Sequence, residues 1–284
     1  MGELGEMKPR KVWGYFEEIS RIPRISKNEG RIRAYLLDFA RKHSLEAKED
    51  SVGNILIVRE AAPGKEKVKT VVLQSHLDMV GEKNASHPHN WNEDPIIPMI
   101  DGRWVTASDT TLGADDGIGI AAQMAVLTDP YLQCGRIECL FTVDEESGMT
   151  GAINLSPDLL TGSILLNLDS EDEGILFIGC AGDIDTQALL PYTPEKVVSG
   201  HRAMNLSVTG LHGGHSGDEI HKGYGNSIKI ISSLLQDLEK KYDIRISNFT
   251  GGNLRNAIPR EAFVTVTFNP AHEEHILADT AAYN

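Results

Sequence analysis

Short β-like runs recur through the first 180 residues, several of them continuously apolar, and they constrain the fold more than any other feature of this sequence. The runs are residues 54–58, 70–74, 136–143, 163–168 and 175–180. Runs of this length without alternation are typical of strands that are buried on both faces. Between the second run and the third, residues 117–128 carry apolar side chains at helical spacing, which predicts a crossover helix. Strands that alternate with helices indicate a layered α/β domain.

A helix is also predicted before the first strand, over about residues 27–43. Apolar residues recur at helical spacing from Ile32 to Ala40. Ser26 and Glu29 have the S-x-x-E spacing of a capping box, in which each side chain binds a free backbone N–H at the start of a helix. The sequence therefore predicts that Ser26 caps this helix.

The pattern changes around residues 190–200, where prolines and threonines form a stretch typical of a domain boundary. Beyond it the sequence predicts strand 203–209, helix 226–242, strands 244–249 and 262–268, and a helical segment that starts near His272. This βαββα order lacks the last strand of a ferredoxin-like βαββαβ unit. We therefore predict two domains, residues 1–183 and 184–284, the second of them incomplete.

Composition excludes several classes of protein. Hydrophobic residues make up 40% of the 284 residues and charged residues 24%, which is typical of a globular protein and not of a disordered chain. The net charge of −14 repels phosphate backbones and anionic lipid, so we expect neither a nucleic-acid nor a membrane partner. The sequence has no apolar run of about 20 residues and no secretory signal, and its three cysteines show no CxxC spacing. These features predict a cytoplasmic protein.

His76 and Asp78 follow the apolar run 70–74. In an extended chain, residues two apart lie on the same side. An imidazole that binds a metal needs an acceptor for its other ring nitrogen, and a carboxylate two residues on can be that acceptor. The alternative is a surface His–Asp pair, which a motif this short would favour if it stood alone.

Further carboxylates follow other predicted elements. Asp115 and Asp116 lie in a glycine-flanked turn before the crossover helix, and for Asp116 the alternative of a plain helix N-cap stays open. Glu145 and Glu146 follow the strand 136–143. In extended chain their side chains would diverge, so one could bind a metal while the other faces substrate as a free base, as metal-assisted hydrolysis requires. The alternative is a solvated acidic turn.

Asp169 follows the strand 163–168, where a carboxylate is costly unless it is capped, paired or coordinated. In an open α/β sheet, ligands bind where parallel strands end. His76, Asp115, Glu146 and Asp169 are one imidazole and three carboxylates at such positions. This donor set suits zinc, with manganese or cobalt as substitutes.

Two glycine-rich loops, residues 211–217 and 251–260, lie in the second predicted unit. Their polar donors could stabilise an oxyanion. The alternative is that the histidines in these turns are structural.

Together these segments resemble the zinc-dependent aminoacyl-histidine dipeptidases, also called cytosol non-specific dipeptidases, of the zinc aminoacylase and exopeptidase superfamily. The matching stretches are SHLDMV, DPIIPMIDGRWV, TTLGADDGIGIAA, FTVDEESGMTGA, LNLDSEDEG, GGHSG and GGNLRNAIPREA. A tripeptidase of the same superfamily shares the GADD turn, but DMV and RNAIPRE are closer to the dipeptidases. The resemblance implies a layered α/β zinc-exopeptidase-like catalytic domain with an inserted, incomplete α+β ferredoxin-like domain that serves as lid and dimerisation domain.

The resemblance also implies a cocatalytic pair of zinc ions. Asp115 would bridge them, His76 and Asp169 would complete the first site, and Glu146 would bind the second ion. Glu145 would be the general base that takes a proton from the bridging water and passes it to the leaving amine.

Three more residues receive implied roles. Asp78 would orient His76, while His215 and Asn256 match lid residues that contact the carbonyl or the carboxylate of the substrate. In relatives such a histidine reaches the cleft of the partner subunit, which implies a homodimer. The expected reaction is hydrolysis of dipeptides, with Xaa-His or broad specificity. The alternatives are an N-acyl amino acid deacylase with the same metal centre, or an inactive fragment that serves only dimerisation.

One departure from the family bears on activity. The family has a last metal-binding histidine and a substrate-binding arginine far beyond the lid, and nothing after Phe268 resembles that region. We therefore expect the chain to be truncated at its C-terminus, its second zinc to keep only Asp115 and Glu146, and the chain by itself to be poorly active.

Overall fold

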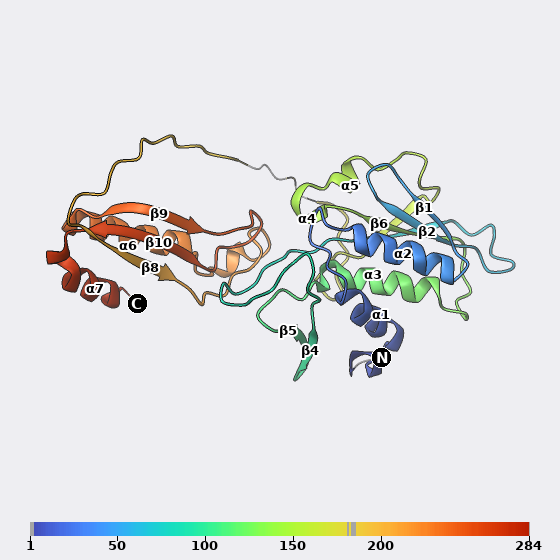
Figure 1. Ribbon diagram of the computed structural model, residues 1–284. Helices are drawn as coiled ribbons and strands as arrows, with labels where there is room; N and C mark the ends of the chain where they lie inside the picture. Colours follow the sequence, from blue (N-terminus) through green and yellow to red (C-terminus); the bar gives the residue numbers. More distant parts are fainter. Residues whose placement is uncertain (1–2, 181, 183–185, 284) are drawn as a thin grey trace. The chain divides into compact units, whose positions relative to one another are not determined.

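The structure is a computed structural model that describes residues 3–180, 182 and 186–283. It divides into two units, Met1–Ala181 and Gly182–Asn284 (Figure 1). The predicted domain boundary after residue 183 lies outside the described residues. None of the described helices has the length and apolarity to span a bilayer.

A five-stranded mixed sheet forms the centre of the first unit. Its strands lie in the order β1-β2-β6-β3-β7. They are β1 (Glu46–Glu49), β2 (Ile55–Arg59), β3 (Val71–His76), β6 (Ile137–Thr142) and β7 (Ile164–Asn167). Strand β3 is parallel to both β6 and β7, whereas β1 and β2 are antiparallel. The carboxyl ends of β3, β6 and β7 therefore meet at one edge of the sheet.

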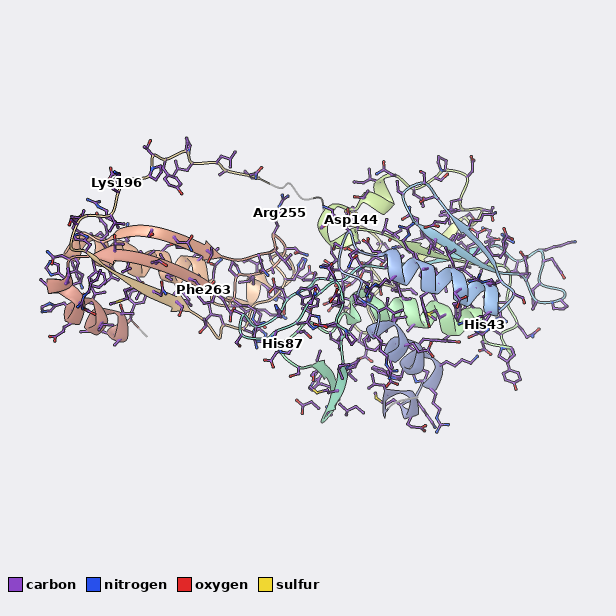
Figure 2. The ribbon with its side chains drawn as sticks, in the orientation of Figure 1. His43, His87, Asp144, Lys196, Arg255 and Phe263 are labelled. Atoms are coloured by element: carbon purple, nitrogen blue, oxygen red, sulfur yellow. The ribbon has the colours of Figure 1, made fainter. Side chains whose placement is uncertain are left out.

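Three helices pack against this sheet, α1 (Arg10–Ser20), α2 (Gly30–Lys42) and α3 (Ala114–Leu127) (Figures 1 and 2). Alternate residues of β2 and β6, such as Ile57 and Phe141, join Phe16, Leu36 and Ile120 in one apolar core. The intervening residues of the same strands face a second cluster that includes Leu56, Leu140 and Leu159. The prediction of strands buried on both faces is therefore confirmed for β2 and β6.

Two of the predicted strands differ from that expectation. Strand β7 is the last strand of the sheet, and its apolar residues Ile164, Leu165 and Leu166 are 40–52% exposed. Residues 175–180 form no strand, because within the described part of the chain they pair with no neighbouring strand. An apolar run predicts a strand only where the fold supplies a hydrogen-bonding partner.

The first unit also contains short elements that the sequence patterns did not reveal. A hairpin of β4 (Pro98–Asp101) and β5 (Trp104–Ala107) forms a separate two-stranded sheet. The short helices are η1 (Glu3–Glu6), α4 (Glu145–Gly148) and α5 (Thr150–Ile153).

The second unit has the predicted βαββα order. Its elements are β8 (Arg202–Val208), η2 (Ile220–Lys222), α6 (Ser227–Tyr242), β9 (Arg245–Gly251), β10 (Ala262–Phe268), η3 (Pro270–His272) and α7 (Glu273–Ala282). The strands form an antiparallel sheet in the order β8-β10-β9. Ile231, Leu235 and Leu238 of α6 pack with Val264 and Val266 of β10 in a core of their own. The Asn226 side chain accepts the Lys229 N–H and caps α6.

Candidate metal centre

Side chains from four separate segments meet at the carboxyl edge of the parallel strands. His76 is the last residue of β3, and Glu145 and Glu146 lie just beyond β6. Asp169 lies two residues beyond β7, and Asp115 lies in the first turn of α3. Because β3 lies between β6 and β7, its histidine is central to the group.

The distances confirm that these side chains converge. His76 Nε2 lies 2.9 Å from Asp115 Oδ1, 3.4 Å from Asp169 Oδ1 and 4.0 Å from Glu145 Oε2. Among the described residues, Glu29, Asp78 and Asp144 form one group that could hold a metal ion, and two further groups share His76, one with Glu145 and Asp169 and the other with Asp115 and Glu146. Within each group the candidate ligand atoms lie within 4.8 Å of one another. The four residues predicted as metal ligands thus lie together, with His76 common to the last two groups.

The second nitrogen of the His76 ring is held by Asp78. Nδ1 lies 3.1 Å from the Asp78 backbone carbonyl and 3.4 Å from the Asp78 carboxylate. Both partners are acceptors, so Nδ1 carries a proton and Nε2 is the nitrogen directed at Asp115 and Asp169. Burial alone would lower the pKa of His76, but its hydrogen bonds to Asp115, Asp169 and Asp78 raise that pKa well above its ordinary value.

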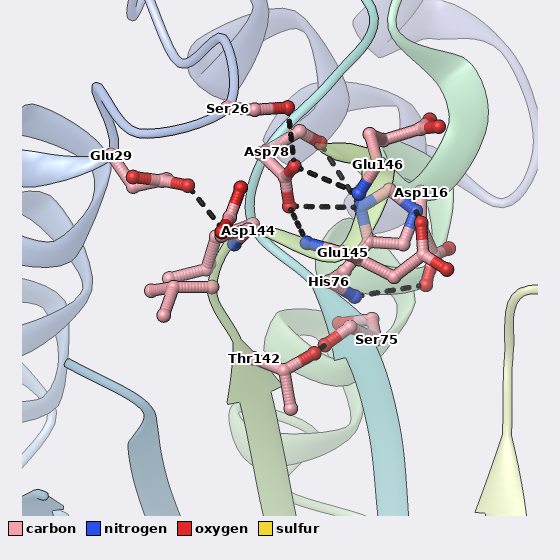
Figure 3. A network of polar contacts seen from close by, with 12 residues as sticks. Ser26, Glu29, Ser75, His76, Asp78, Asp116, Thr142, Asp144, Glu145 and Glu146 are labelled. Carbon is pink, nitrogen blue, oxygen red and sulfur yellow. Dashed lines mark hydrogen bonds and ion pairs between the residues drawn. The ribbon is translucent and has the colours of Figure 1, made fainter. Parts of the chain in front are cut away.

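The Asp78 carboxylate also positions the turn that carries the two glutamates. It accepts hydrogen bonds from the Glu145 N–H at 3.0 Å, the Glu146 N–H at 3.2 Å and the Ser26 hydroxyl at 2.7 Å (Figure 3). Burial opposes ionisation of Asp78, but hydrogen bonds from His76, Ser26 and the Glu145 backbone lower its pKa. This fully buried carboxylate therefore links β3 to the segment after β6.

That segment is a helical turn and not the extended chain that the sequence predicted. Asp144 has φ +52°, and α4 begins at the next residue. The Asp144 N–H donates to Glu29 Oε1 at 3.0 Å (Figure 3). Its carboxylate accepts the hydroxyls of Ser147 and Thr150. The turn brings both glutamates close to His76: Glu145 lies in one of the two groups around this histidine, and Glu146 lies in the other.

Asp115 and Asp116 have different environments although they are adjacent. Both have non-helical φ and ψ angles within the first turn of α3. Asp116 accepts the Gly119 N–H at 3.1 Å, which is the hydrogen bond of a helix N-cap, and the His76 backbone N–H at 3.3 Å. The N-cap residue of α3 is Gly113, so Asp116 makes a capping hydrogen bond at the kink inside the helix, and Asp115 is the residue that faces the His76 ring.

The predicted capping box at Ser26 and Glu29 is wrong. Lys27 has φ +66°, and α2 begins only at Gly30. The Ser26 hydroxyl donates to Asp78, and Glu29 accepts the Asp144 backbone N–H. Both side chains support the candidate metal centre across the fold, a role that their local spacing does not reveal.

The centre concentrates negative charge. Burial, with the nearby Asp115 carboxylate, raises the pKa of Glu146 to about 8. Burial, with the Asp169 carboxylate, raises the pKa of Asp116 to about 8. Burial also raises the pKa values of Glu145 and Asp169. A bound cation would offset the cost of keeping such carboxylates ionised. One imidazole with several carboxylates is also a zinc donor set, so these residues fit divalent metal ions.

Asn54, the residue before β2, supports the same turn and was not found from the sequence. It is fully buried, its side-chain amide donates to Asp50 and to the Gly151 carbonyl, and its oxygen accepts the Val143 N–H. An Asn54→Ala variant should lose about 1–3 kcal/mol of unfolding free energy, because it leaves buried polar groups without partners. Urea denaturation measures this loss. The exposed Asn92→Ala variant should stay within about 0.5 kcal/mol of wild type, and equal effects of the two substitutions would contradict this account.

The two predicted lid residues lie in the second unit. An isolated bridge pairs His215 with Ala257, and the Ser216 N–H donates to the Asn256 carbonyl at 2.8 Å, so the two glycine-rich loops are adjacent. His215 Nδ1 accepts the N–H groups of Gly217 and of the following residue, each at 3.1 Å. Its proton is therefore on Nε2, which is left as a donor. Contacts of His215 and Asn256 with a substrate stay predictions.

Comparisons with known proteins agree with this fold. Residues 198–280 match the peptidase dimerisation domain (M20_dimer). The cytosol non-specific dipeptidase of Escherichia coli K12 is 46% identical over 266 residues, which are 94% of this chain and 55% of that protein. The crystal structure of aminoacylhistidine dipeptidase from Vibrio alginolyticus is 42% identical with a TM-score of 0.63, over 99% of this chain and 58% of that chain.

A more distant structure shares the fold alone. Aminopeptidase PepT from Bacillus cereus ATCC 10987 is 20% identical with a TM-score of 0.50, over 98% of this chain and 71% of that one. The chain spans little more than half the length of its dipeptidase relatives. Sequence and fold together confirm the predicted resemblance: over nearly its whole length the chain is similar to the cytosol non-specific dipeptidase and to the aminoacylhistidine dipeptidase, and residues 198–280 of its second unit match the peptidase dimerisation domain.

Proposed function

We propose that this protein hydrolyses dipeptides, with broad or Xaa-His specificity, at a centre of two zinc ions. The observation that carries the proposal is the convergence of one imidazole and four carboxylates at a single sheet edge, with donor atoms at metal-ligand spacing. The names of its relatives from Escherichia coli and Vibrio alginolyticus, both dipeptidases, support the choice of substrate.

The ligands divide between two ions. His76 and Asp169 would hold the first ion, Glu146 would hold the second, and Asp115 would be shared by both. Manganese or cobalt could substitute for zinc, since the same nitrogen and oxygen donors bind them. When bound, the ions would supply Lewis acidity that activates a water molecule and polarises the peptide carbonyl.

The chain's own groups would move and hold the protons. Glu145 lies 4.0 Å from His76 Nε2, and burial raises its pKa, which favours a carboxylate that accepts a proton from water and returns it to the leaving amine. Asp78 keeps the proton of His76 on Nδ1. In the lid, the Nε2–H of His215 and the Asn256 amide would donate to the carbonyl or the carboxylate of the substrate.

The second unit would join two copies of the chain. Its match to the peptidase dimerisation domain supports a homodimer through this unit. The net charge of −14 argues against nucleic acid as a partner. The cytosol is the compartment that we propose, by analogy with the Escherichia coli relative. Light scattering should give twice the mass of one chain, and a monomer at micromolar concentration would contradict the homodimer.

A substrate panel tests the proposed reaction. Metal-free protein is assayed with zinc, manganese or cobalt on Xaa-His dipeptides, other dipeptides, tripeptides and N-acyl amino acids. We expect turnover that depends on the metal and is greatest for dipeptides. Absence of turnover with every metal would overturn the enzymatic proposal, and preference for N-acyl amino acids would identify a deacylase instead.

Zinc should also stabilise the fold. At a free concentration about 100 times the Kd, an ion that binds only the native state adds about 2.7 kcal/mol to the free energy of unfolding. For a unit of the size of the first one, Met1–Ala181, this gain corresponds to a rise in Tm of roughly 5–10 °C. Thermal unfolding with zinc and then with excess chelator measures the effect. An unchanged Tm with zinc would contradict metal binding by the folded protein.

A further inference from the structure

Arg24 is a fully buried arginine at the base of the metal centre. It lies between α1 and α2, is 2% exposed, and has the largest of the fully buried side chains. Long cationic side chains are rarely buried unless a specific set of partners compensates for the lost water. The residue therefore needs an explanation beyond core packing.

All three hydrogen bonds of the guanidinium go to backbone carbonyl oxygens. Nη1 donates to the carbonyls of Leu77 at 2.9 Å and Asp78 at 2.8 Å, and Nη2 donates to the carbonyl of Gly113. The first two carbonyls directly follow His76, and the third lies two residues before Asp115. One rigid guanidinium therefore joins the two segments that carry these proposed ligands.

The Asp78 carbonyl has a second donor. It is also the acceptor 3.1 Å from His76 Nδ1, so Arg24 holds the same oxygen that fixes the orientation of the imidazole. The guanidinium binds this shared oxygen and the Gly113 carbonyl, so it holds the backbone segments that carry His76 and Asp115. The side chains of these two residues lie 2.9 Å apart.

The two glycines that flank Asp115 and Asp116 leave room for this guanidinium. A Cβ at Gly117 would lie 2.6 Å from Arg24 Nη2, and a Cβ at Gly113 would lie 2.9 Å from the same atom. Real Cβ atoms do not approach other atoms this closely, so a Cβ at Gly117 would displace the arginine or the turn, and a Cβ at Gly113 would also displace Met79, whose Sδ would lie 2.7 Å away. The glycine spacing of the GADDG turn is thus matched to a buried cation.

The guanidinium also places a permanent positive charge beside the acidic cluster. Burial lowers the pKa of Arg24 to about 10, although Asp78, Asp116 and other nearby carboxylates oppose the shift, so the group stays protonated at neutral pH. Because its N–H groups bind carbonyls, it reduces the repulsion among the carboxylates without occupying the oxygens that would bind metal.

We propose that Arg24 is a positioning residue for the metal centre: it fixes the spacing of the His76 and Asp115 segments and leaves their side chains free to bind zinc. This inference rests on the proposed function, because it assigns Arg24 a role toward the ions that function requires. A purely structural arginine would contribute to folding stability and leave metal affinity unchanged.

Two variants disturb the guanidinium in different ways. Arg24→Lys keeps the charge but lacks the planar fork that reaches three carbonyls. Gly117→Ala keeps Arg24 and pushes a methyl group against its Nη2. The matched control is Gly14→Ala in α1, where an added Cβ meets no atom within 4 Å.

Zinc affinity is measured by competition with a chromophoric chelator, and the visible spectrum of the cobalt-loaded protein reports ligand geometry. Far-ultraviolet circular dichroism checks that each variant is folded. We expect Arg24→Lys and Gly117→Ala to bind zinc about 10–100-fold more weakly than wild type, with altered cobalt spectra, and Gly14→Ala to match wild type.

Folded variants with wild-type zinc affinity and cobalt spectrum would overturn the role of Arg24 while leaving the proposed function intact. If Arg24→Lys does not fold, the zinc affinity and cobalt spectrum of Gly117→Ala test the role of Arg24, since that variant retains the arginine. A wild-type protein that binds no zinc would overturn the proposed function itself, and this inference with it.

Discussion

A His76→Gln variant should lose zinc binding and dipeptide hydrolysis, each by more than about 100-fold. His76 is the one residue common to the two candidate groups of metal ligands that contain Glu145 and Glu146. A glutamine amide fills similar space but lacks the basic ring nitrogen that zinc binds. Competition with a chromophoric chelator measures the affinity, and a coupled assay of amino-acid release measures the rate.

His87→Gln is the matched control for this experiment, because that histidine is half-buried on a loop of the same unit (Figure 2). It should retain zinc affinity and rate. A His76→Gln protein that binds zinc as wild type does would remove His76 from the metal centre and contradict the proposed ligand set.

A Glu145→Gln variant should retain zinc and lose about 10²–10⁴-fold in kcat, the usual contribution of a general base. Glutamine preserves the shape of the side chain and cannot accept the proton from water. KM should change little, because the lost interaction belongs to the transition state. Zinc titration and steady-state kinetics on one dipeptide separate these effects.

Glu146→Gln is the comparison that assigns the two glutamates. It removes a proposed ligand of the second ion, so it should weaken binding of that ion as well as the rate. The two glutamates lie in different groups around His76, one with Asp169 and one with Asp115. Loss of zinc in Glu145→Gln, with zinc retained in Glu146→Gln, would reverse their proposed roles.

The convergence of the site was predictable because it depends on strand order more than on detailed packing. His76 and Asp169 follow apolar runs, and parallel strands bring such positions to one edge of a sheet. The structure pairs β3 with both β6 and β7, which makes that edge continuous. The same reasoning failed for residues 175–180, where an apolar run has no pairing partner within the described residues.

The supporting residues were not predictable, because their partners are distant in sequence. Ser26 lies 52 residues from the Asp78 carboxylate that it binds, and its local spacing with Glu29 favoured a helix cap instead. Arg24 contacts a carbonyl 89 positions away at Gly113. Local patterns report helix and strand periodicity, whereas tertiary hydrogen bonds decide which polar side chains turn inward.

Anomalous diffraction from crystals grown with zinc, measured on both sides of the zinc absorption edge, locates the bound ions. We expect two peaks about 3.5–4 Å apart. One should lie about 2.0–2.2 Å from His76 Nε2 and from an Asp169 oxygen, with Asp115 bound to both ions and Glu146 to the second. Peaks elsewhere, or none beside His76, would contradict the proposed metal centre.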